Sequence, residues 1–130
     1  MSMPRSLMLL LMLSTVCLHE SLARADGNQL LEQCTGAERI LDRPETFKGD
    51  YGRVFLNIGM CTGLVQGTRQ TMSILNSSVP THLKACVPDG ANNSQAIRIV
   101  LQYLRANPQF LHYPEVSLIF RALQEAYPCR

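Results

Sequence analysis

Four cysteines in the later part of the chain restrict its fold more than any other feature. They are Cys34, Cys61, Cys86 and Cys129, and no two of them form the close C-x-x-C pair that structural metal sites usually contain. A metal site is therefore the weaker alternative. An even number of cysteines in a short exported chain is typical of a disulfide framework. The sequence predicts two disulfides, and four cysteines allow three pairings.

Export itself is indicated by residues 1–25, which have the organisation of a cleavable signal peptide. Arg5 supplies a positive charge, an apolar run extends from Leu7 to Leu18, and Ala23-Arg24-Ala25 has small residues where a signal peptidase reads them. An uncleaved membrane anchor is the alternative, but the run is shorter than the ~20 apolar residues that span a bilayer. We expect cleavage after Ala25 and a mature chain of residues 26–130 that does not associate with a membrane.

The charge of the chain argues against nucleic acid as its partner. The full sequence carries a net charge of +2, and removal of Arg5, Glu20 and Arg24 with the signal peptide brings the mature chain closer to neutral. Its basic residues occur singly, whereas nucleic-acid-binding domains concentrate lysine and arginine on one face or in one run.

Four stretches after residue 25 repeat apolar residues every three or four positions, which is the period of an amphipathic helix. Asparagine precedes two of them, as helix N-caps often do, and prolines end them. The expected helices run from Asn28 to the residue before Pro44, from about Arg53 to Leu75, from Asn92 or Asn93 to Asn107, and from Pro114 to Tyr127. Their predicted apolar faces include Leu30, Cys34, Ala37 and Leu41 in the first helix and Val116, Ile119, Phe120 and Leu123 in the last.

Short amphipathic helices can bury their apolar faces only against one another. The sequence therefore predicts an all-α fold, a small four-helix bundle in one domain of residues 26–130. A core built from about a hundred residues is marginal in size. Two disulfides, each contributing ~2–4 kcal/mol, would compensate for it.

The link between the last two helices predicts how the cysteines pair. This link is short, so the two helices should lie antiparallel, with the start of the third beside the end of the fourth. Cys86 then lies near Cys129. Cys34 and Cys61 remain to join the first helix to the second.

Residues 76–92 form the longest irregular segment. Pro80, Pro88 and Gly90 prevent a regular helix there, and long connections in compact domains are often functional. Cys86 should fasten the segment partway along. We expect its first part to contact a partner, through Ser77, Ser78, Val79, Pro80, Thr81, His82, Leu83 and Lys84. The shorter link from Asn107 to Tyr113 is the second candidate.

Three glycines lie four residues apart on one face of the second helix. A glycine inside a helix costs ~0.5–1 kcal/mol relative to alanine, so three in a row predict a close approach of another backbone. We expect close helix packing at Gly59, Gly63 and Gly67, with another helix of the same chain or, as the alternative, with a second chain or partner.

No group of residues in the sequence has the pattern of a catalytic site. His82 and His112 are isolated, no His/Glu cluster resembles a zinc site, and Ser77 and Ser78 lack the setting of a catalytic serine. Cysteines held in disulfides cannot act as thiolates. We therefore expect a binding protein that is not an enzyme and that carries no cofactor and no metal.

Several motifs together resemble the Rap/Tai immunity proteins of bacterial type VI secretion systems. The matching pieces are C-x-G-x-x-x-G at Cys61–Gly67, C-V-P at Cys86–Pro88, and A-L-x-x-A-Y-P-C at Ala122–Cys129. Leu30–Cys34 fits the family's first helix, so the resemblance covers nearly the whole mature chain.

This resemblance implies a periplasmic helical protein that binds a cognate peptidoglycan amidase effector and blocks its active site. Some members of the family are homodimers, so it also allows a homodimer. The alternative is a periplasmic chaperone or assembly factor without a cognate toxin. Such a factor would expose apolar surface or change with pH, for which the two histidines left after signal removal are few.

Overall fold

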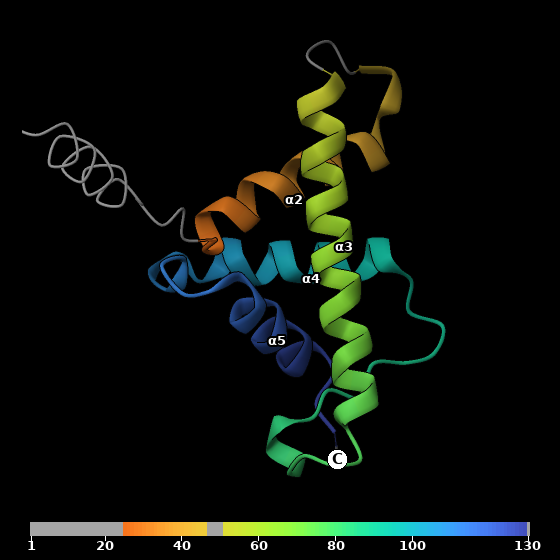
Figure 1. The fold of residues 1–130 in the computed structure, drawn as a ribbon, viewed down its shortest axis with the longest axis vertical. Helices are drawn as coiled ribbons and strands as arrows, with labels where there is room; N and C mark the ends of the chain where they lie inside the picture. Colours follow the sequence, from red (N-terminus) through yellow and green to blue (C-terminus); the bar gives the residue numbers. More distant parts are fainter. Residues whose placement is uncertain (1–24, 47–50, 130) are drawn as a thin grey trace, which may run out of the picture.

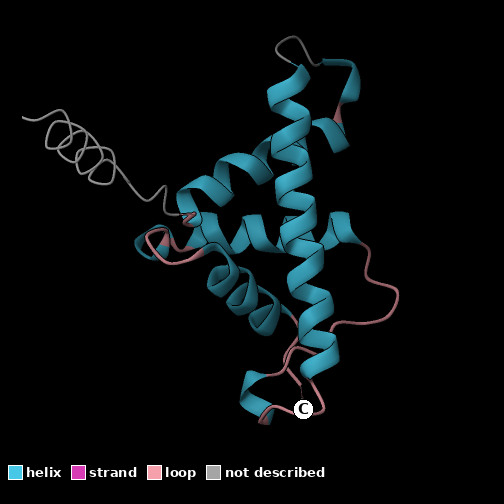
Figure 2. Cartoon of the chain, in the orientation of Figure 1, coloured by secondary structure: helices cyan, strands magenta, loops and turns pink. Residues whose placement is uncertain are grey.

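The structure, a computed structural model, describes residues 25–46 and 51–129. Four α-helices and no strand occur in these ranges (Figures 1 and 2). The helices are α2 (Gly27–Asp42), α3 (Tyr51–Leu75), α4 (Asn93–Ala106) and α5 (Glu115–Ala126), with short 3₁₀ turns η2 (Pro44–Thr46), η3 (Thr81–Leu83) and η4 (Pro108–Phe110). The predicted signal peptide lies outside the described residues, apart from Ala25. No described helix is long and apolar enough to cross a membrane.

Each of the four helices contacts the other three, which confirms the predicted bundle. The long helix α3 crosses over α2 and α4, and the chain turns after α4 so that α5 runs back below α4, beside α3 (Figure 1). The core is formed where these helices meet. Its largest fully buried side chains are Leu30, Ile97, Leu101, Leu104, Leu118, Ile119, Leu123, Val65, Val100, Cys34 and Cys61.

Both predicted disulfides are confirmed. Cys34 joins Cys61 and Cys86 joins Cys129, each with 5.1 Å between the Cα atoms. The first ties α2 to α3 inside the core, where both cysteines have no exposed surface. The second fastens the segment between α3 and α4 to the end of the chain.

The N-cap of α4 was predicted correctly from the sequence, whereas that of α2 was not. Asn92 caps α4 as predicted, and its side-chain oxygen accepts a hydrogen bond of 2.8 Å from the backbone N–H of Gln95. The start of α2 was misplaced, because Asp26 and not Asn28 is its N-cap. The Asp26 carboxylate accepts hydrogen bonds from the backbone N–H groups of Asn28 at 2.9 Å and Gln29 at 3.2 Å.

The predicted close packing of the α3 glycines against another helix of the same chain is not found among the described residues, and packing against a second chain stays a prediction. Gly59, Gly63 and Gly67 are exposed, and a Cβ built at any of them would meet nothing within 4 Å. Cys61, Val65, Thr68 and Met72 form the buried side of α3, and the glycines lie on its outer side. The glycine that does pack closely is Gly27, where a Cβ would lie 2.9 Å from the Leu111 carbonyl oxygen.

Candidate partner-binding surface

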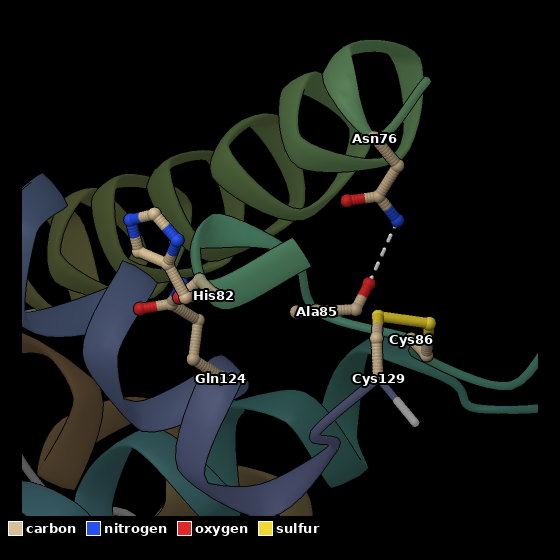
Figure 3. Close-up of a disulfide and its surroundings, with 6 residues drawn as sticks. All are labelled: Asn76, His82, Ala85, Cys86, Gln124 and Cys129. Atoms are coloured by element: carbon tan, nitrogen blue, oxygen red, sulfur yellow. Dashed lines mark hydrogen bonds between the residues drawn. A yellow bond between two sulfur atoms is a disulfide. The ribbon is translucent and has the colours of Figure 1, made fainter. Parts of the chain in front are cut away.

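The segment 76–92 is irregular as predicted, and it is fastened at several points. The side-chain amide of Asn76 donates to the Ala85 carbonyl at 2.9 Å, and that of Gln124 donates to the His82 carbonyl at 3.1 Å. The Cys86 N–H donates to the Tyr127 carbonyl at 2.8 Å. Figure 3 shows the adjacent disulfide between Cys86 and Cys129. The segment is therefore held by α3, by α5 and by the end of the chain.

The first part of this segment projects from the end of the bundle. After α3, the 3₁₀ turn η3 forms the bottom of the view in Figure 1. Of the predicted contact residues, Ser77, Ser78, Pro80, Thr81, His82 and Leu83 are exposed, whereas Val79 and Lys84 are half-buried. Leu83 has 41% of its surface exposed, although hydrogen bonds hold the backbone on both sides of it. The structure thus brings the eight residues together on one projection.

A hollow of about 490 Å³ lies at the base of the projection, between α3 and residues 85–89. Its α3 wall carries the polar side chains of Arg69, Gln70, Ser73 and Asn76. The Arg69 guanidinium donates to the Ala91 carbonyl and so holds the second half of the segment against α3. Arg69 was not predicted as a functional residue, although it is one of only two charged residues in α3 and lies between the buried and the outer sides of the helix.

The second candidate, the link from Asn107 to Tyr113, forms an aromatic cluster on a different part of the molecule. The Arg121 guanidinium lies 5.7 Å from the Phe110 ring centre and 5.6 Å from that of Tyr113. The rings of His112 and Tyr113 are 4.4 Å apart. Exposed tyrosine and arginine are common anchors in protein interfaces, so this link remains a candidate contact.

The outer side of α3 forms a third surface. Apolar side chains with much exposed surface lie there, including Leu56 at 63%, Met60 at 48% and Ile74 at 76%. The open glycines Gly59, Gly63 and Gly67 lie between them, and the exposed Arg53 lies near the start of the same side of α3. These exposed apolar side chains and open glycines make the outer side of α3 a third candidate contact surface.

Titratable residues show no arrangement of a catalytic centre in the part of the chain that the structure describes. No group of three or more histidine, cysteine, aspartate or glutamate residues there could hold a metal ion. The pKa of Glu115 is raised, first by burial of its carboxyl and then by the negative charge of Asp26. This carboxyl lies at the start of α5, away from the projecting segment.

Comparison with known proteins assigns the family. A protein-family model described as Rap1a immunity proteins matches residues 26–129, which include all four helices and both disulfides. No curated protein and no solved structure matches the chain. The chain therefore belongs to the Rap1a immunity proteins.

Proposed function

We propose that the mature chain is a periplasmic immunity protein that binds and inhibits a peptidoglycan amidase effector of type VI secretion. The leader, residues 1–25, is removed during export, and one mature chain blocks one enzyme without a cofactor. The observation that carries this proposal is the fastened projection of residues 77–84 on a chain of an immunity family.

An inhibitor of this kind needs a protrusion that is already ordered before it binds. Ordering a side chain or loop on binding costs ~0.5–1.5 kcal/mol for each immobilised side chain, so a segment that is fixed in advance binds more tightly. The disulfide and the bonds from Asn76 and Gln124 fix this segment at both sides. Leu83 is its exposed apolar side chain and is suited to fill a pocket of the enzyme.

The test uses the purified mature protein and the secreted amidase encoded beside its gene. We expect inhibition at about one chain per enzyme, and no peptidoglycan hydrolysis by the chain alone. Replacing residues 77–84 with a Gly/Ser segment of equal length should abolish inhibition while both disulfides still form. A replaced chain that inhibits like the original would refute the assignment of the segment. An original chain that binds no secreted amidase of its own genome would refute the immunity function.

A matched pair of substitutions separates contact from stability. Leu83→Asp changes an apolar side chain on the projection that is 41% exposed. Val116→Asp changes one on α5 that is 49% exposed. Loss of an interface anchor costs ~2 kcal/mol or more, so Leu83→Asp should weaken inhibition by more than about 10-fold. Val116→Asp should inhibit like the original protein. Equal effects of the two variants would contradict a contact through Leu83.

The outer side of α3 supports a second part of the proposal, a homodimer. Two copies of this face could pack closely because the glycines admit a neighbouring backbone and exposed apolar side chains lie beside them. Sedimentation should show a dimer that Gly63→Leu dissociates. A monomer that binds unfolded polypeptides through Leu56 and Met60 would instead support the alternative function of a chaperone.

A further inference from the structure

The start of α2 is docked tightly onto the link between α4 and α5. Gly27 is buried, and its N–H donates to the Tyr113 carbonyl at 3.1 Å. A side chain at this position would collide with Leu111 and Leu118. In Figure 1 the first turn of α2 (orange) lies beside the blue segment that precedes α5. The backbone at residues 26 and 27 is therefore fixed in place.

Asp26 continues this docking by one residue. It forms an antiparallel bridge with Pro114, which directly precedes the first residue of α5. Its own carboxylate already accepts the N–H groups of Asn28 and Gln29 as the cap of α2. The backbone nitrogen of Asp26 is thus held next to the beginning of α5.

Glu115, the first residue of α5, is buried, and one of its carboxyl oxygens has no hydrogen-bond partner among the described residues. Only 7% of its surface is exposed, and the oxygen without a partner is Oε1. Burial raises its pKa, and the neighbouring Asp26 carboxylate raises it further. A buried carboxylate beside a second negative charge is costly unless a cation or further donors reach it. Among the described residues no cationic side chain forms an ion pair with this carboxyl, and the start of α5 supplies only a partial positive charge.

We propose that removal of the leader supplies a cationic group, because the new α-ammonium of Asp26 forms an ion pair with the Glu115 carboxylate. The inference rests on the proposed cleavage after Ala25 and not on the identity of the inhibited enzyme. A leader peptidase adds water across the Ala25–Asp26 bond. The carbon–nitrogen bond breaks, Ala25 leaves with a carboxylate, and the freed nitrogen of Asp26 takes a proton.

The chemistry of the new group fits the site. An α-amino group has an ordinary pKa of about 7.7–8.0, so it is mostly charged at pH 7 and has three N–H donors. Before cleavage the same nitrogen is a neutral amide with one donor. After cleavage it opposes the negative charges of both Asp26 and Glu115. Maturation thus completes the contact between α2 and α5.

The α-ammonium could either stabilise or destabilise the protein, and the two possibilities predict opposite effects of acetylating it. The N-terminus of a helix has a partial positive charge, so an ammonium there would by itself destabilise α2. The proposed ion pair predicts that the ammonium stabilises the protein, because the Glu115 carboxylate attracts its positive charge. The experiment compares the mature exported chain with the same chain acetylated on its α-amine below pH 7, where lysine side chains stay protonated. Glu115→Gln is the test variant, and Glu125→Gln, an exposed carboxyl on the same helix, is the control.

Mass spectrometry should first show a chain that begins at Asp26. Acetylation should lower the melting temperature of the original chain and of Glu125→Gln by several degrees, and it should leave that of Glu115→Gln unchanged or raise it. The pKa of the α-amine, measured by NMR, should be higher in the original chain than in Glu115→Gln. A mature chain that begins elsewhere, or acetylation effects that are equal in all three proteins, would overturn the proposal. No amidase is present in these measurements, so their outcome is independent of the immunity function.

Discussion

The two disulfides hold two regions of the molecule in different ways. Cys34–Cys61 lies in the core between α2 and α3, and both of its cysteines are fully buried. Cys86–Cys129 lies at the end of the bundle, where Cys86 is exposed and a segment without regular helix joins the end of the chain. The comparison teaches that one bond supports the packing of helices, whereas the other keeps a projecting segment in place.

The length of the chain between the paired cysteines would not by itself make the two disulfides contribute differently to stability. The cysteines are 27 residues apart in the first pair and 43 in the second. The entropy of the unfolded chain then favours the second bond by only roughly 0.4 kcal/mol. Burial is the larger difference, because loss of the core bond also leaves space among packed side chains.

The largest effect is therefore expected from Cys34→Ala with Cys61→Ala. Loss of the chain constraint and of core packing together should lower the free energy of unfolding by about 4–6 kcal/mol. Urea denaturation under oxidising conditions measures it. A cost no greater than that of removing the other disulfide would contradict the assigned difference between the two regions.

Cys86→Ser with Cys129→Ser should cost less, about 2–4 kcal/mol, since the helices keep their contacts. We expect protease cleavage within residues 77–91 and a loss of amidase inhibition out of proportion to the change in stability. Limited proteolysis with mass mapping locates the cleavage. A variant that resists the protease and inhibits normally would show that hydrogen bonds from Asn76 and Gln124 suffice to hold the segment.

Two glycines extend the comparison from disulfides to backbone packing. Gly27→Ala should lower the free energy of unfolding by about 1–3 kcal/mol, because the methyl group meets Leu111 and Leu118. Gly63→Ala faces open space and should raise it by ~0.5–1 kcal/mol through helix propensity. Thermal melts of both variants at low concentration, where a dimer dissociates, measure the contrast. Destabilisation by Gly63→Ala under those conditions would show a close contact within the chain.

The smallest effect is expected at the ion pairs between α2 and α4. Arg98 pairs with Asp42 at 2.5 Å, but both side chains are about half exposed. Such pairs contribute ~0–1 kcal/mol, so Arg98→Ala should change the free energy of unfolding by less than about 0.5 kcal/mol. A larger loss that disappears in high salt would mean that charge, as well as burial, supports the core region.

Much of this architecture follows from local patterns in the sequence. The four helices, the Asn92 cap, the irregular segment and both disulfide pairings were predicted correctly, because each depends on spacing, capping or a short link. The limits of the apolar faces were less certain. Leu41 and Val116 fit the helical period, yet each is 49% exposed, so the period alone does not say where a buried face stops.

The sequence by itself determined the helices, the pairing of the cysteines and the family, because these are written in periodicity and in motifs. Only the tertiary structure decided which segments of the backbone lie in close contact. The three spaced glycines of α3 have no neighbour in the described chain, whereas the single Gly27 does. Likewise, nothing in the sequence connects Asp26 with Glu115, which lie far apart along the chain and meet through the bridge to Pro114. A pattern identifies a helical face, but the element that covers the face is set by how all four helices pack together.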